Sequence, residues 1–138
     1  MKVVVDTNVF VSGFLSPFGR PAGVLRLVLS GKVGLLYDIR ILSEYREVLS
    51  RPKFHFKKEN IEMLLEHIQM EGQFAVAEPL SDPLKDPSDE MFLEIAVSGG
   101  AECLVTGNLK HFPAHKYKGI YLLDPAGFME HFQKKIGE

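Results

Sequence analysis

The sequence of 138 residues has no tryptophan and only one cysteine, Cys103. One cysteine cannot form an internal disulfide or a cysteine-based zinc site, so a reducing cytoplasm is the simplest location. The N-terminus lacks an apolar stretch long enough for a signal peptide or a membrane span. The net charge is only −2, so no global positive field points to nucleic acid. These absences argue against a secreted disulfide-rich domain and a membrane protein, but not against a protein with a local basic patch.

Hydrophobic residues make up 46% of the chain and charged residues 25%, a mixture typical of globular domains. The length fits a single domain over residues 1–138 that can bury a real core. Short apolar runs predict strands at residues 2–5, 33–37, 74–77, 103–106 and 120–123. Apolar stripes and stop signals predict helices at residues 21–29, 41–51, 58–71, 89–98 and from 125 to near 135. Strands that alternate with helices indicate an α/β domain with a mainly parallel sheet.

Polar residues recur just after the predicted strands or at the start of the helices that follow them. In open parallel sheets, ligands bind beyond the carboxyl ends of the strands. Residues that are far apart in sequence would therefore meet at one edge. The polar residues predicted at this edge are Asp6, Glu44, Asp86, Asp89, Glu90, Thr106 and Asn108.

Some of these acids also have an ordinary structural interpretation. Asp6 could close an Asx-turn with its own backbone. In the stretch "DPSDE", Asp86 could cap a helix, with Pro87 in the first turn and Asp89 three residues on. The same Asp-Pro start occurs at Asp124, to which no chemistry is assigned. Asp89 taken alone is therefore better explained as a helix-start residue than as a ligand.

Glu44 could likewise be a solvated helical acid, and Asn108 could cap the turn before "LKHF". The functional interpretation rests on the set, because Asp6, Glu44, Asp89 and Asn108 share one predicted edge. Two carboxylates about 4 Å apart repel by about 4 kcal/mol at an effective dielectric constant near 20. They stay ionised together only if a cation neutralises them, and oxygen ligands suit Mg²⁺ or Mn²⁺. Mg²⁺ and Mn²⁺ bound in this way promote the hydrolysis and transfer of phosphoryl groups.

Four stretches of the chain together resemble a PIN domain. They are "VVVDTNVFVSG", "LSEYREVL", "KDPSDEMFLEIAVSGGAECLVTGN" and "LKHF". They run in the family's order, cover nearly the whole chain and are similar to the VapC-like toxins of toxin–antitoxin systems. The resemblance implies a three-layer α/β/α fold around a mainly parallel sheet. It also implies a ribonuclease that depends on Mg²⁺ or Mn²⁺ held in an acidic pocket.

The resemblance also assigns roles to residues of this chain. The residues that match the family's three acids and strand-end threonine are Asp6, Glu44, Asp89 and Thr106. The three acids would hold the metal, and Asn108 falls at the catalytic position where the family usually has a fourth acid. An asparagine in place of this acid removes one negative charge, which argues against a second metal ion more than against the first. Asp86 or Glu90 could supply the missing charge.

Asn8 separates the PIN resemblance from another enzyme class. A phosphatase of the haloacid dehalogenase type also begins with an apolar strand and an aspartate. Such an enzyme needs a second aspartate two residues later as general acid, and an amide cannot shuttle that proton. In the PIN interpretation, Asn8 instead orients Asp6 or caps the next turn, and Ser12 contacts the same network.

The implied substrate is RNA, cleaved by a water that the metal and Asp89 activate, to leave a 5′-phosphate and a 3′-hydroxyl. Basic residues beside aromatic ones can hold phosphates and stack bases. Two such clusters lie at residues 51–58 and 110–118. The first can equally be a solvated loop, whereas the second follows the strand-end motif. Lys110, His111 and Lys116 are therefore the predicted RNA-binding residues.

The resemblance implies two protein partners as well. VapC-like toxins usually form homodimers and are blocked by a small antitoxin that covers the acidic pocket. Phe14, Leu15 and Phe18 could form an exposed apolar face for either partner, or could belong to the core. A different class stays open because of Asn108: a catalytically weak PIN domain that binds RNA or a partner without cutting. Binding of Mg²⁺ or Mn²⁺ by the acidic residues would distinguish the two.

Overall fold

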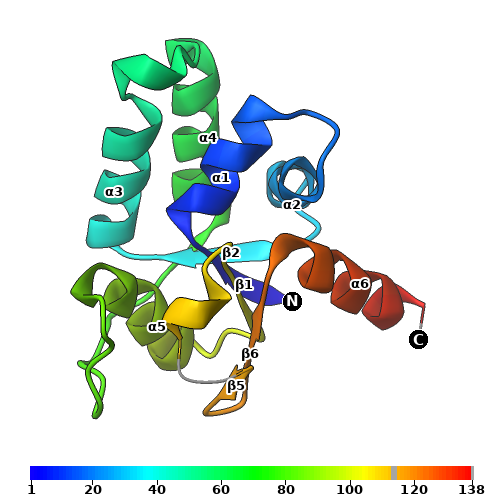
Figure 1. Cartoon of the computed structure of the whole chain (residues 1–138). Coiled ribbons are helices and arrows are strands. Elements are labelled where there is room, and N and C mark those ends of the chain that lie inside the picture. Colours follow the sequence, from blue (N-terminus) through cyan, green and yellow to red (C-terminus); the bar gives the residue numbers. More distant parts are fainter. Residues whose placement is uncertain (113–114, 138) are drawn as a thin grey trace.

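The computed structural model describes residues 1–112 and 115–137 (Figure 1). The strands of its sheet are β1 (Lys2–Val5), β2 (Gly34–Tyr37), β3 (Gln73–Phe74), β4 (Cys103–Val105), β5 (Lys116–Tyr117) and β6 (Ile120–Leu123). The α-helices are α1 (Thr7–Leu15), α2 (Arg20–Leu29), α3 (Ile39–Leu49), α4 (Lys58–Glu71), α5 (Pro87–Gly99) and α6 (Pro125–Ile136). Two short 3-10 helices are η1 (Pro52–Phe54) and η2 (Leu109–His111).

The strands form one sheet in the order β3-β2-β1-β4-β6-β5, and only β5 runs antiparallel to its neighbour. The three valines of β1 are fully buried, as expected for a central strand covered on both faces. Val5 pairs with Val105, and Val105 pairs with Leu123, so β1, β4 and β6 end level with one another. Asp6 and Thr106 therefore leave the sheet side by side at its carboxyl edge.

Helices cover both faces of this sheet, which confirms the predicted α/β class and the mainly parallel sheet. In Figure 1, α5 lies below the β1–β2 part of the sheet, and α2, α3 and α4 lie above it. Helix α6 packs against α2 and against β4 and β6. Within the described residues, no helix combines the length and the apolar character needed to cross a lipid bilayer.

Helix α1 was not predicted from the sequence, because "TNVFVSGFL" is rich in β-branched and aromatic residues that favour strands. Tertiary packing overrides this local preference. Val9 and Phe10 are buried, and the Phe10 ring meets the Tyr45 ring edge-on with centroids 5.0 Å apart. A Cβ on Gly13 would lie 3.1 Å from the Pro21 carbonyl oxygen, so this glycine permits the close approach of α1 and α2.

Two further strands differ from the prediction. The strand predicted at residues 74–77 is β3 at Gln73–Phe74. The Ala75 amide still donates to the Tyr37 carbonyl, but β2 then turns into α3 and offers no further partner. Strand β5 was not predicted; positive φ angles at Lys118 (47°) and Gly119 (85°) make the tight turn that pairs it with β6.

Candidate active site

Asp6 stands at the N-cap position of α1, immediately after β1, and is only 4% exposed. Its carboxylate makes no capping hydrogen bond to α1; it accepts one of 2.8 Å from the Thr106 hydroxyl. Burial raises the pKa of Asp6 to about 6, and the nearby carboxylates of Asp89 and Glu44 act in the same direction. The Thr106 hydroxyl and the Asn8 backbone amide oppose this rise in the pKa. The Asn8 amide, two residues on, is the partner that an Asx-turn would use, but the Thr106 hydrogen bond links Asp6 to the neighbouring strand as well.

Glu44 projects from the second turn of α3 and is half-buried. Its carboxylate accepts a hydrogen bond from the hydroxyl of Thr7, the first residue of α1. Next to it, the buried Tyr45 hydroxyl donates to the Val5 carbonyl at the end of β1. Burial raises the pKa of Tyr45 well above its ordinary value, and the carboxylates of Asp6 and Glu44 add to the rise. Helix α3 thus ties Glu44 to the same strand end as Asp6.

Asp86 and Asp89 stand at the start of α5. Asp86 caps the helix as predicted, because one carboxylate oxygen accepts both the Ser88 amide (3.0 Å) and the Ser88 hydroxyl (2.7 Å). Asp89 is buried, and its Oδ2 lies 3.1 Å from His111 Nδ1. Burial and the Asp86 carboxylate raise the pKa of Asp89, and the His111 contact opposes that rise. Donor atoms of Asp86, Asp89 and His111 all lie within 4.8 Å of one another.

Asn108 is half-buried and acts through its backbone. Its amide donates to the Thr106 hydroxyl oxygen (3.0 Å), and this hydroxyl in turn donates to Asp6. Its carbonyl accepts the His111 amide (2.9 Å), which closes η2. The strand-end turn therefore connects the first acid of the site with the histidine that contacts Asp89.

The remaining supporting residues lie on α1 and α5. Asn8 and Ser12 are exposed on α1, where the Asn8 amide influences the pKa of Asp6. Glu90 is half-buried on α5, and its carboxylate accepts the Leu84 amide (3.1 Å) from the preceding loop. Glu90 thus fastens this loop to α5.

The predicted RNA-binding residues do not all lie together. Lys110 and His111 are in η2, directly after the strand-end turn. Lys116 lies on the edge strand β5, where its ammonium sits 4.7 Å from the centre of the Tyr121 ring. Three strand spacings, about 14 Å, separate β5 from β1. The structure therefore places Lys110 and His111, but not Lys116, close to the acidic edge.

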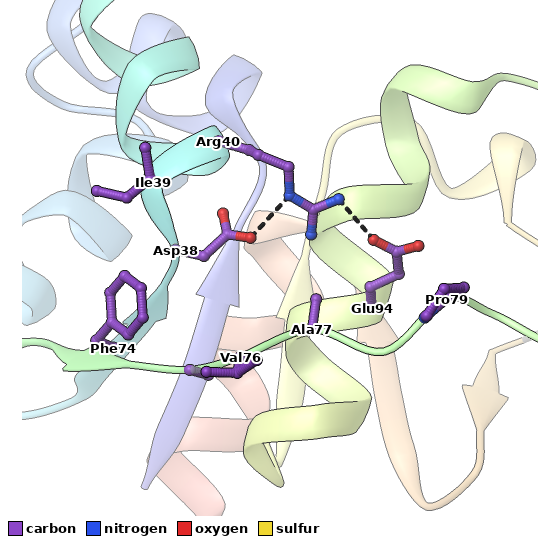
Figure 2. A pocket seen from close by; sticks show the side chains of 9 residues that line it. Asp38, Ile39, Arg40, Phe74, Val76, Ala77, Pro79 and Glu94 are labelled. Atoms are coloured by element: carbon purple, nitrogen blue, oxygen red, sulfur yellow. Dashed lines mark hydrogen bonds and ion pairs between the residues drawn. The ribbon is translucent and has the colours of Figure 1, made fainter.

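An ion-pair network beside the site was not predicted. Figure 2 shows the Arg40 guanidinium between Asp38 and Glu94, with both contacts at 2.8 Å. Asp38 also caps α3 by accepting the Ile41 amide at 2.9 Å. The position of Asp38 directly after β2 could have indicated it, by the reasoning applied to Asp6. No comparable signal points to Arg40 or Glu94.

This network borders a hollow of about 330 Å³ beside the edge strand β3. The residues that line the hollow are Asp38, Ile39, Arg40, Phe74, Ala75, Val76, Ala77, Pro79 and Glu94. Arg40 bridges two carboxylates here, so the network joins the start of α3 to α5 and keeps a formal charge of one negative unit. Asp6, Glu44 and Asp89 are not part of the hollow.

The acidic edge suits a divalent metal ion. Asp6, Glu44 and Asp89 offer carboxylate oxygens, the donors that Mg²⁺ and Mn²⁺ prefer. Within residues 1–112 and 115–137, no lysine, arginine or histidine nitrogen lies within 4.0 Å of the Asp6 or Glu44 carboxylates. Burial, with a smaller contribution from the nearby Asp89 and Glu44 carboxylates, raises the pKa of Asp6, and a bound cation would favour its ionised form.

A family model described as "PIN domain" matches residues 2–110, a range that contains Asp6, Glu44, Asp89 and Asn108. The chain belongs to the PIN domain family. The chain is also similar to the uncharacterized protein MJ1680 of Methanocaldococcus jannaschii. The two are 27% identical over 150 aligned residues, which cover 99% of this chain and 94% of that protein. The family is associated with nuclease activity, and its members typically use a divalent metal.

Proposed function

We propose that this PIN domain is a metal-dependent endoribonuclease that hydrolyses RNA phosphodiesters at the Asp6, Glu44 and Asp89 carboxylates. The proposal rests mainly on the burial and the raised pKa of Asp6. Asp6 is buried at the carboxyl edge of the sheet, and its pKa is raised to about 6 by burial and by the other two acids. Ionised carboxylates in such a place are unfavourable without a cation, and the family supports the use of a divalent metal.

Each protein group has a role in this proposal. The Asp6, Glu44 and Asp89 carboxylates hold Mg²⁺ or Mn²⁺, directly or through water. When bound, the metal supplies a nucleophilic hydroxide and neutralises phosphate charge. Asp89 accepts the proton of the attacking water, and the Thr106 hydroxyl orients Asp6 through its 2.8 Å hydrogen bond. The water oxygen would bond to phosphorus as the bond between phosphorus and the 3′ oxygen breaks, and the leaving 3′ oxygen would take a proton from solvent. The expected products carry a 5′-phosphate and a 3′-hydroxyl.

A basic hollow next to Asp89 supports RNA as the substrate. It measures about 330 Å³, and its lining residues are Pro83, Leu84, Lys85, Lys110, His111 and Phe112. His111 belongs to both the hollow and the acidic cluster. A phosphate held by Lys85 and Lys110 would therefore lie beside the carboxylates. Lys116 remains a separate prediction, because it lies on β5.

We further propose that the protein acts in the cytoplasm as the toxin of a toxin–antitoxin pair, as a homodimer that a small antitoxin blocks. Exposed apolar residues support a protein partner, because Leu15 is 58% and Phe18 is 96% exposed. Phe14, by contrast, packs against Phe56 with ring centroids 5.2 Å apart.

Light scattering of the wild type and of Phe18→Ser tests whether the protein forms a dimer through this face. Expression in a bacterial host tests the toxin activity: the wild type should arrest growth, and Asp6→Asn should not.

The second candidate is an RNA- or partner-binding module with weak or no catalysis. Asn108 favours it, because an amide stands where the family usually has an acid. The backbone of Asn108 still supports Thr106. A site without catalytic activity would thus keep the same backbone turn between Thr106 and Asn108.

Cleavage of a mixed RNA pool by the purified full chain separates these functions. We expect the wild type to cut with Mg²⁺ or Mn²⁺, to stop with EDTA, and to lose at least a hundredfold in rate in Asp6→Asn. Asp124→Asn is the matched control: this exposed aspartate also follows a strand and caps α6, and asparagine caps equally well. It should retain activity. A folded wild type that binds the pool and never cuts it would contradict the nuclease and support the binding module.

A further inference from the structure

We propose that Asp86, Asp89 and His111 form a second divalent-metal position, in which the His111 imidazole supplies a nitrogen ligand. This position takes over from the fourth acid that Asn108 replaces. The inference rests on the proposed function, because Asp89 would serve both positions.

The distances fit a shared ion. Asp89 Oδ2 and His111 Nδ1 are 3.1 Å apart. A six-coordinate ion with bonds of about 2.1 Å places neighbouring ligand atoms about 3 Å apart. A donor atom of Asp86 completes a group in which all three atoms lie within 4.8 Å of one another. Such a set can close around one cation with small side-chain movements.

Asp86 is better placed than Glu90 to contribute. Both bonds from Ser88 reach the same oxygen of Asp86, Oδ1, so the second oxygen is not used in capping. The Glu90 carboxylate instead accepts the Leu84 amide and fastens the preceding loop. The structure therefore favours Asp86 of the two acids as the source of the missing charge.

The backbone explains why a histidine three residues after Asn108 can take this role. The His111 amide donates to the Asn108 carbonyl (2.9 Å), so η2 folds His111 back toward the carboxyl edge. The Phe112 amide donates to the Leu109 carbonyl (3.1 Å), and the buried Phe112 side chain anchors the turn in the core. His111 is thus held close to Asp89 and keeps its imidazole half-exposed.

A nitrogen ligand changes which metal is preferred. Mg²⁺ favours oxygen donors, whereas imidazole favours later transition metals, and Mn²⁺ accepts both donor types. We therefore expect the second position to bind Mn²⁺ more tightly than Mg²⁺. The first position, with carboxylates alone, should discriminate less between the two ions.

Pulsed electron paramagnetic resonance of Mn²⁺ bound to the full chain tests the proposal, because it detects ¹⁴N bonded to the ion without any activity measurement. The wild type should bind two Mn²⁺ ions and show ¹⁴N coupling. His111→Gln should lose the coupling, and its second site should bind Mn²⁺ at least tenfold more weakly. His67→Gln on α4 is the matched control and should behave as the wild type. Thermal unfolding checks that both variants are folded.

The outcomes separate this inference from the proposed function. Bound Mn²⁺ without ¹⁴N coupling in the wild type, or coupling that persists in His111→Gln, would overturn the role of His111. If RNA cleavage still depended on Asp6, the proposed nuclease would stand. A folded wild type that neither binds Mn²⁺ nor cleaves RNA would overturn both.

Discussion

The Thr106 hydroxyl donates a 2.8 Å hydrogen bond to Asp6 Oδ2, although the two residues are 100 positions apart in the chain. The contact exists because β1 and β4 are parallel neighbours that end level with one another. The same hydroxyl accepts the Asn108 amide, so its hydrogen points toward Asp6. This bond favours the ionised form of Asp6.

Thr106→Val should therefore weaken metal binding. Valine keeps the shape of the side chain but removes the hydrogen bond that stabilises the Asp6 carboxylate. The pKa of Asp6 should rise further, and the pH at which the apparent affinity for Mn²⁺ is half-maximal should move upward. Loss of a hydrogen bond to a charged group, worth about 1.5–3 kcal/mol, would raise the pKa of Asp6 from about 6 to above 7, so competition from protons would weaken the affinity for Mn²⁺ roughly 2- to 15-fold at pH 7.

Calorimetric titration with Mn²⁺ at several pH values measures this effect. Thr106→Ser is the matched control, because it keeps the hydroxyl and should retain most of the affinity. Equal affinities of Thr106→Val and wild type across the pH range would show that the hydroxyl does not tune Asp6.

Asp6→Asn should stabilise the metal-free protein at neutral pH. The pKa of Asp6 is raised from 3.8 to about 6, so the folded state keeps a proton that the unfolded state has already lost. The contribution of this group to stability is therefore present below the unfolded pKa and is lost as pH rises through about 6. Complete loss corresponds to on the order of 3 kcal/mol. Asparagine has no such dependence.

Urea unfolding in EDTA at pH 4.5 and pH 7.5 tests this prediction. The stability of Asp6→Asn relative to the wild type should be higher at pH 7.5 than at pH 4.5. Asp124→Asn controls for the loss of one charge at the sheet edge outside the pocket. Saturating Mn²⁺ should then stabilise the wild type more than Asp6→Asn. A stability difference that is the same at both pH values would contradict the raised pKa of Asp6.

Tyr45→Phe should destabilise the fold by about 1–3 kcal/mol, because it leaves the Val5 carbonyl without its hydroxyl donor. Both residues are buried, so water cannot easily replace the lost bond. Tyr121→Phe on β6 is the control: Tyr121 is exposed, and the change should stay within about 0.5 kcal/mol. Chemical denaturation measures both. Unchanged stability in Tyr45→Phe would mean that this hydroxyl does not support the end of β1.

The spacing of apolar residues along the chain predicted helices and strands correctly where the tertiary packing agreed with it. The apolar spacing of Ile61, Leu64, Leu65 and Ile68 predicted α4 at residues 58–71, and all four are buried. Strands β1 and β6 were likewise predicted at their observed bounds. The pattern failed for α1, whose residues favour a strand and whose helix is held by packing against α2 and α3.

The sequence by itself determined the α/β class, the mainly parallel sheet and the set of polar residues at strand ends. It did so because apolar residues recur at different spacings in strands and in amphipathic helices.

Only the tertiary structure decided which of these polar residues meet. Strand register joins Asp6 to Thr106, and the η2 turn carries His111 to Asp89. The hairpin at Lys118–Gly119 leaves Lys116 on the far edge strand. Contacts of this kind depend on register and turn geometry between distant segments, which local composition does not encode.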